Sequence, residues 1–150
     1  MKEFITIIQN PVFLSAIIAW FLSQGIKVAT SVFRYKRFDL ERVMGSGGMP
    51  SSHTASVVAS TFTAGLLEGY GSTFFGLGMV LSGIIMYDAA GVRMAAGKQA
   101  RVINRIVKEL GEHRFKFDEN LKELLGHTYF EVVGGAVLGI LIAYLHVGRH

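Results

Sequence analysis

The sequence predicts an all-α protein, a polytopic membrane bundle of about four transmembrane helices with an amphipathic interfacial helix. Three observations predict this class. Of the 150 residues, 51% are hydrophobic, and the mean hydropathy is +0.41. The apolar residues form blocks close to the ~20 residues that a helix needs to cross a bilayer. The 18 glycines suit closely packed membrane helices. We expect one integral-membrane domain, 1–150.

Four apolar segments are the predicted membrane helices, at 11–33, 50–67, 73–92 and 128–147. We expect the first to be a retained helix rather than a signal peptide, because its start is not strongly basic and no convincing cleavage pattern follows it. The second is the least hydrophobic, so we expect it to contact other helices rather than lipid. Small-xxx-small spacing predicts close packing at four glycines: Gly65, Gly69, Gly135 and Gly139.

The connections between these segments differ in charge. The second connection has no lysine or arginine, whereas the first and third are basic. The positive-inside rule therefore predicts that the first and third connections face the cytoplasm, most simply across a bacterial plasma membrane. The basic residues of these two connections are Arg34, Lys36, Arg37, Arg42, Lys98, Arg101, Arg105, Lys108, Arg114, Lys116 and Lys122.

The third connection, 94–126, is predicted as a basic amphipathic cytoplasmic insertion within the domain. Apolar residues recur at helical spacing from Ala100 to Leu110, which predicts a helix that ends near Gly111. A second short helix is expected at 118–125. We favour a surface helix packed on the bundle or lying in the lipid interface over a catalytic role for this insertion.

Composition also limits which metals, nucleic acids or membrane surfaces the protein could bind. The chain has no cysteine, which excludes disulfides and thiolate metal sites. Its net charge of +4 comes from basic residues that flank apolar blocks. An anionic membrane surface explains that pattern better than a nucleic acid does.

The predicted topology returns a set of polar and charged residues to one side of the membrane. They lie at the end of the first and third segments and at the start of the second and fourth. Ionisable groups at a membrane boundary are costly and are therefore candidates for function. The set contains Lys27, Arg34, Ser51, Ser52, His53, Arg93, His127 and Glu131.

These residue types suit phosphoryl transfer. Cations neutralise a phosphate and the charge that develops on it, and the glycine-rich stretch before His53 offers backbone N–H groups and hydroxyls. Two histidines can divide the roles of nucleophile and general acid. Glu131 follows His127 by one helical turn, so its carboxylate can orient the imidazole and leave the other ring nitrogen free.

In order and spacing, these residues resemble three motifs of the type 2 phosphatidic acid phosphatase superfamily, which also contains vanadium haloperoxidases. The first motif is Lys27 and Arg34, with Tyr35 in place of proline. The second is 50–53, Pro-Ser-Ser-His, with serine in place of glycine. The third is split, with Arg93 before the 94–126 insertion and His127 after it. The pattern is most similar to the divergent branch of this superfamily.

The resemblance implies a membrane lipid phosphatase or diphosphatase that uses neither metal nor cofactor. By resemblance, His127 is the nucleophile that forms a phosphohistidine, Glu131 orients it and His53 protonates the leaving oxygen. The phosphate would be bound by Lys27, Arg34, Ser51, Ser52 and Arg93. Because four helices make a thin wall around a polar site, we also expect a homo-oligomer, a dimer.

Two alternatives stay open. Asp88, inside the third segment, is either a structural acid paired with a neighbouring cation, which we favour, or a catalytic or metal-binding carboxylate. The whole protein could instead be a non-catalytic membrane protein that binds an anionic lipid head group or helps to assemble a membrane complex. The remaining histidines, His113, His146 and His150, are expected on the surface.

Overall fold

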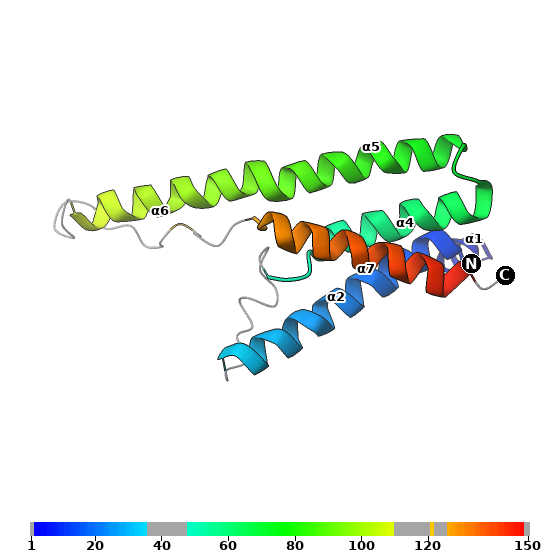
Figure 1. Ribbon diagram of the computed structural model, residues 1–150, viewed down its shortest axis with the longest axis horizontal. Coiled ribbons are helices and arrows are strands. Elements are labelled where there is room, and N and C mark those ends of the chain that lie inside the picture. The colour runs from blue at the N-terminus through cyan, green and yellow to red at the C-terminus, as the bar shows by residue number, and fades with distance from the viewer. Residues whose placement is uncertain (1, 36–47, 110–120, 122–125, 149–150) are drawn as a thin grey trace.

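The computed structural model describes residues 2–35, 48–109, 121 and 126–148. All of its regular elements in these ranges are helices. They are α1 (Lys2–Ile8), α2 (Pro11–Tyr35), α4 (Ser52–Glu68), α5 (Thr73–Tyr87), the π-turn η1 (Asp88–Val92), α6 (Arg93–Glu109) and α7 (Tyr129–Val147). Figure 1 shows α5 and α6 as one long rod; α4 packs against the α5 half, and α7 and α2 pack against α4. The prediction of a helical membrane bundle is confirmed.

Polar residues at the helix starts explain where the helices begin. Asn10 Oδ1 accepts hydrogen bonds from the Val12 and Phe13 N–H groups at 2.9 and 3.2 Å, and a proline occupies the first position of α2. Ser51 and Ser72 cap α4 and α5 in the same way. These side chains satisfy N–H groups that the first turn of a helix leaves without an internal partner.

Within the described residues, three helices are long and apolar enough to cross a membrane, at Pro11–Phe33, Thr73–Glu109 and Tyr129–Val147. The second predicted segment, 50–67, is the 17-residue helix α4, which contacts α2, α5 and α7. Its hydroxyls bond back to its own backbone: Ser56 Oγ donates to Ser52 O at 2.9 Å and Ser60 Oγ to Ser56 O at 3.0 Å. As expected, this least hydrophobic segment is surrounded by other helices.

Small residues occupy the places where the helices approach most closely. The central cluster joins Ala19 of α2, Ala55 and Ala59 of α4 and Ile142 of α7. A Cβ placed on Gly139 would lie 2.6 Å from Ala55 O, so only glycine allows this approach of α7 to α4.

The glycine prediction is confirmed at three of its four positions. A Cβ on Gly135 would lie 2.5 Å from Ser51 O, and one on Gly65 would lie 2.7 Å from the Phe75 ring. Gly69 is different, because it ends α4 with a φ of 90° and has no atom within 4 Å of its Cβ position. It serves as a helix terminator rather than a packing residue.

The predicted end of the third segment at Val92 is not the end of a helix. The chain continues through η1 into α6, whose helical pattern of apolar and basic residues begins at Arg93. α6 extends α5 in nearly the same direction (Figure 1), so it projects from the bundle instead of crossing its end. The predicted helix at 118–125 and the end of α6 near Gly111 lie outside the described residues.

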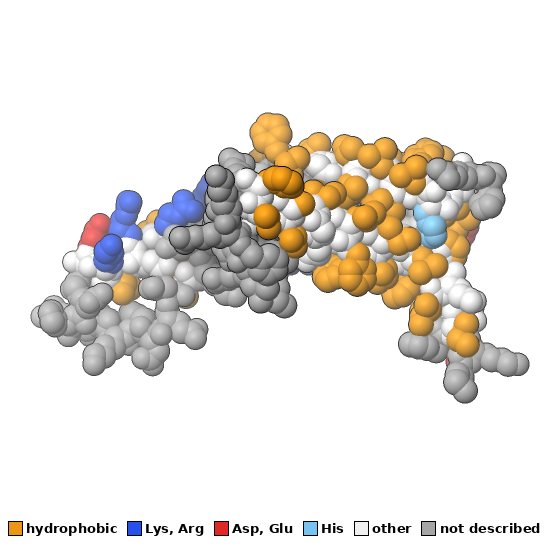
Figure 2. Space-filling view, turned by 90° about the horizontal axis from the view of Figure 1, so that it is seen from below, with side chains coloured by type: hydrophobic (Ala, Val, Ile, Leu, Met, Phe, Trp, Pro, Cys, Tyr) orange, Lys and Arg blue, Asp and Glu red, His pale blue; other side chains and the backbone are white. Residues whose placement is uncertain are grey.

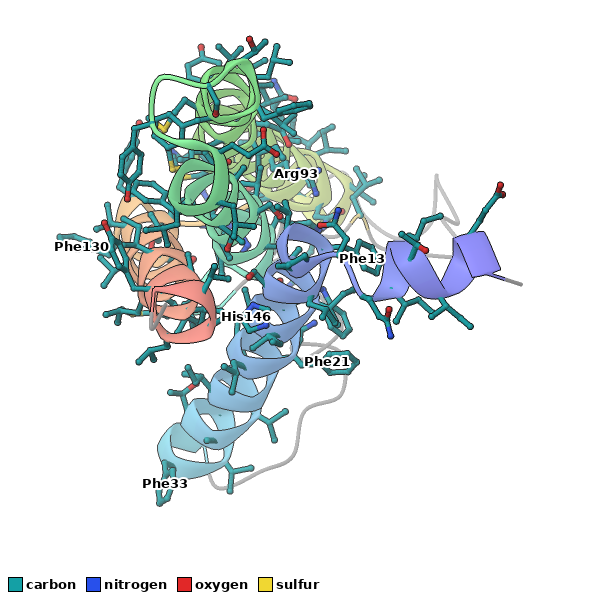
Figure 3. The ribbon with its side chains drawn as sticks, turned by 90° about the vertical axis from the view of Figure 1, so that its right-hand side faces the viewer. Phe13, Phe21, Phe33, Arg93, Phe130 and His146 are labelled. Atoms are coloured by element: carbon teal, nitrogen blue, oxygen red, sulfur yellow. The ribbon has the colours of Figure 1, made fainter. Side chains whose placement is uncertain are left out.

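Charge and apolar surface are separated along the molecule. Figure 2 shows apolar side chains over the bundle, and lysine and arginine side chains on the projecting α6 end. In Figure 3 the labelled Phe13, Phe21, Phe33 and Phe130 point away from the bundle. The apolar exterior is what a helix bundle surrounded by lipid requires.

Candidate functional site

The candidate site lies where the starts of α4 and α7 meet the π-turn and the Lys27 turn of α2. Two backbone hydrogen bonds join the starts of α4 and α7 and the π-turn. Ser51 N–H donates to Glu131 O at 2.9 Å, and His127 N–H donates to Ala89 O at 2.9 Å. Segments that are up to 80 residues apart in the sequence therefore share one end of the bundle (Figure 1).

His127 and Glu131 form the contact that the spacing predicted. His127 is only 2% exposed, and its Nδ1 lies 3.2 Å from Glu131 Oε2. An ionised carboxylate only accepts hydrogen bonds, so Nδ1 carries the proton and the lone pair of the neutral ring is on Nε2. Within the described part of the chain, the buried Nε2 has no hydrogen-bond partner.

Glu131 also belongs to a capping box that starts α7. Glu131 N–H donates to Thr128 Oγ1 at 3.4 Å, and Thr128 N–H donates to Glu131 Oε2 at 2.9 Å. The same oxygen, Glu131 Oε2, thus accepts from the Thr128 N–H that caps α7 and contacts the imidazole of His127. This double role gives a physical reason for glutamate here, because the box uses glutamate or glutamine at this position. The Thr-x-x-Glu spacing was a signal for it in the sequence.

The electrostatic surroundings favour the neutral form of His127. Burial, and next the positive charge of Lys27, hold the pKa of His127 below its usual 6.5, while Glu131 opposes the shift. We take the lowering as the net direction because the ring is almost fully buried. His127 is therefore a neutral imidazole near pH 7, as a nucleophile must be.

Lys27 and Ser52 form the next wall of the site. Lys27 is 5% exposed, and its Nζ donates to Ser52 Oγ at 3.4 Å. Its charge lies within Coulombic range of Glu131. A buried lysine in an apolar helix needs such partners or a bound anion.

Ser51 and His53 have different environments in the same turn. Ser51 is fully buried, and its Oγ accepts from Thr54 Oγ1 at 3.0 Å and from Thr54 N–H at 3.4 Å. Its hydroxyl therefore serves mainly as the cap of α4. His53 is exposed and lies within Coulombic range of Arg93, Lys27 and Asp88, so it is on the open side of the cluster.

Arg93 and Asp88 form an ion pair at the same end, with Arg93 Nε 2.6 Å from Asp88 Oδ2. Arg93 is one of the partners expected for Asp88, but the Asp88 side chain is partly exposed and not buried as we expected. Both side chains are partly exposed, at 47% and 39%, and Figure 3 shows Arg93 near the start of α6. Among the described residues, the Arg93 guanidinium bonds to Asp88 through Nε alone, and its other N–H groups could donate to an anion.

The long insertion does not separate the two parts of the third motif in space. Gly126, with a φ of 90°, lies so close to the Arg93–Met94 backbone that a Cβ there would collide with Met94 N. The next residue, His127, bonds to Ala89. The site residues missed by sequence analysis are thus Thr128, Gly126 and the Ala89 carbonyl, and no local pattern marked the last two.

Other predicted residues fall outside this cluster. The side chain of Arg34, and all of His113 and His150, lie outside the described part of the chain. His146 corrects an expectation, because it is not a free surface residue: its Nδ1 lies 2.8 Å from Ser15 Oγ, to which Thr63 Oγ1 donates at 2.8 Å. Figure 3 shows His146 directed from α7 toward α2.

The described residues bring together a buried imidazole, an exposed histidine and cations. Among the described residues, no group of three His, Asp or Glu side chains could hold a metal ion. Lys27, whose Nζ donates to the hydroxyl of Ser52, is close enough to His127 for its charge to act on the ring. These are the components of a phosphate-binding or phosphoryl-transfer site.

Comparison with known proteins agrees with this organisation. The model of the Divergent PAP2 family matches residues 8–142. The chain is 36% identical over 149 residues to the uncharacterized membrane protein YuiD of Bacillus subtilis (strain 168), covering 91% of this chain and 93% of that protein. No solved structure matches the chain. The membrane helices and the order of the polar residues agree with these matches. This chain belongs to the Divergent PAP2 family of membrane proteins.

Proposed function

We propose that this membrane protein hydrolyses a lipid phosphate or diphosphate through a phosphohistidine intermediate. The observation that supports this most directly is the state of His127. Its Nδ1 is held by Glu131 at 3.2 Å, and its buried Nε2 has no partner among the described residues. This is how a histidine nucleophile is prepared: one nitrogen is oriented and the other keeps its lone pair.

In the first step, His127 Nε2 attacks phosphorus and the bond from phosphorus to the lipid oxygen breaks. His53 gives its proton to that oxygen, so the lipid leaves as an alcohol, or as a monophosphate if the substrate is a diphosphate. In the second step, water attacks the phosphohistidine and His53 takes its proton. The phosphorus–nitrogen bond breaks, inorganic phosphate leaves, and both histidines return to their starting state.

The cations of the site stabilise the phosphoryl group as it is transferred. Lys27, Ser52 and the N–H groups at the start of α4 would contact its oxygens, with Arg93 on the open side. The substrate would be a lipid because these groups lie at the end of membrane-spanning helices. We propose that this end faces the cytoplasm of a bacterial cell and that the protein works as a dimer.

Purified protein tests this function by phosphate release from prenyl and glyceryl lipid phosphates in the presence of a chelator. We expect turnover, inhibition by vanadate and an acid-labile phosphoryl group on His127. His127→Ala should reduce turnover to background, whereas His146→Ala, which changes a histidine elsewhere in the bundle, should retain it. Equal background rates for wild type and His127→Ala on every lipid would exclude the hydrolase.

One observation favours a second candidate, a non-catalytic site for anionic lipid head groups. Arg93 is already paired with Asp88 at 2.6 Å, and His127 is almost inaccessible in this conformation. A binding protein needs the cations but not the histidine. Vesicle binding that survives His127→Ala and is lost in Arg93→Ala, with no phosphate released by wild type, would establish this candidate.

A further inference from the structure

The π-turn η1 interrupts the helical rod at the candidate site. The Arg93 N–H bonds to Asp88 O, five residues earlier. In an α-helix, Arg93 would bond to Ala89 O, four residues earlier. Ala89 O instead accepts the His127 N–H at 2.9 Å. Such single π-turns are rare and are frequently found at functional sites.

The residue before His127 is fitted to the same turn. Gly126 has a φ of 90°, a conformation that L side chains adopt at a cost. The position of its missing Cβ lies 2.8 Å from Arg93 C and from Met94 Cα. Close backbone contact, and not conformation alone, therefore requires glycine at this position.

The π-turn also brings Asp88 and Arg93 together. Residues three or four apart share a face of an α-helix, whereas residues five apart do not. The wider π-turn places Asp88 Oδ2 2.6 Å from Arg93 Nε. One irregular turn thus holds Arg93 through its side chain and His127 through its backbone.

We propose that η1 is a docking platform that reunites the two halves of the site across the insertion, with the Ala89 carbonyl and Gly126 as positioning residues for His127. The family motif that this chain resembles keeps arginine and histidine close in sequence. Here the platform replaces that short connection, so 94–126 can be long without displacing the imidazole. The catalytic consequence of this proposal rests on the proposed function, but the docking itself does not.

The test compares two glycines that have the same positive φ but differ in their surroundings. Gly126 and Gly69 both have a φ of 90°, yet a Cβ on Gly69 meets no atom within 4 Å. Gly126→Ala and Gly69→Ala therefore impose a similar conformational cost, and only Gly126→Ala adds a collision with the platform. Gly69→Ala is the matched control.

The first measurement does not depend on activity. In full-length protein labelled with ¹⁵N-histidine in detergent, the amide signal of His127 is assigned by its loss in His127→Gln. We expect this amide to exchange slowly with D₂O in wild type and Gly69→Ala, and about tenfold faster in Gly126→Ala. Equal exchange in the two alanine variants, with both folded, would overturn the platform.

The second measurement separates kcat from KM on a lipid phosphate. Displacement of the nucleophile should lower kcat in Gly126→Ala on the order of 100-fold, while KM changes little because Lys27 and Ser52 stay in place. Gly69→Ala should retain the wild-type kcat. Faster exchange with no activity in wild type would refute the proposed function and leave the platform standing. A wild-type kcat in Gly126→Ala would refute the positioning role.

Discussion

At the scale of single residues, His127 combines burial, an oriented Nδ1 and an Nε2 that has no hydrogen-bond partner in the described part of the chain. Its neighbours act on its proton affinity in opposite directions. Lys27 disfavours the imidazolium and Glu131 favours it. The pKa of this ring is therefore a direct report on whether the predicted cluster exists in solution.

We expect the His127 ring to titrate below its usual value of 6.5. Because neutral imidazole predominates above the pKa, the acid limb of activity should also lie below that pH. Lys27→Met should move the midpoint upward and Glu131→Gln should move it downward, since each removes one opposing charge. NMR of ¹³C-labelled histidine across pH measures this. A wild-type midpoint above 6.5 would contradict the buried, Lys27-adjacent environment.

A different residue, His53, is predicted to protonate the leaving oxygen. His53→Gln keeps the size and a hydrogen bond but cannot donate a proton in the same way. We expect turnover of a lipid phosphate, whose alkoxide is a poor leaving group, to fall about 100-fold. Release of p-nitrophenolate, which needs no protonation, should fall much less. Equal losses on both substrates would show that His53 binds phosphate without acting as an acid.

At the scale of elements, the contact between α4 and α7 depends on missing side chains. Gly139→Ala would place a methyl group 2.6 Å from Ala55 O and 2.9 Å from Ala59 N. We expect overpacking to lower stability by about 1–3 kcal/mol, measured as a reduced Tm in detergent by circular dichroism.

The control for this change is Gly83→Ala on α5. A Cβ there meets no atom within 4 Å, and alanine has the higher helix propensity. Its Tm should equal or exceed that of wild type. If Gly139→Ala is as stable as Gly83→Ala, then α4 and α7 are not in close contact.

The helices also show which parts of the fold sequence patterns could predict and which they could not. Apolar length predicted α2, α5 and α7, and low hydropathy correctly placed α4 among other helices. Periodicity could not predict that α6 continues α5, because a π-turn has no sequence signature that distinguishes it from an α-helical turn. Nor could the spacing Gly65–Gly69 show that Gly69 ends a helix, since that depends on the φ of one residue.

At the scale of the whole molecule, one end of the bundle carries the site and the basic α6, and the other end carries α1 and the end of α7 (Figure 1). The cations on the projecting α6 (Figure 2) support the proposed cytoplasmic orientation through the positive-inside rule.

The chain has no cysteine, so single cysteines can test this orientation. Glu68 and Lys108 are exposed and lie near opposite ends of the molecule. On intact cells, a membrane-impermeant maleimide should label Glu68→Cys, and it should label Lys108→Cys only after lysis. The reverse pattern would place the site on the outer face.

The predicted dimer belongs to the same scale. Four packed helices leave a large apolar exterior and a thin wall around Lys27, which a second copy would thicken. Light scattering in detergent should give a protein mass twice the 16.4 kDa of one chain, with activity lost on dissociation. A fully active monomer would contradict the prediction.

The sequence by itself determined the membrane class, the four main helices and the shared end of the polar residues, because hydrophobic length and charge are local properties of the chain. It also paired His127 with Glu131, since four residues make one helical turn. Only the tertiary structure decided that Arg93 and His127 lie together. That proximity depends on a carbonyl released by a π-turn and on a glycine with no room for a side chain, which are contacts between residues distant in the chain.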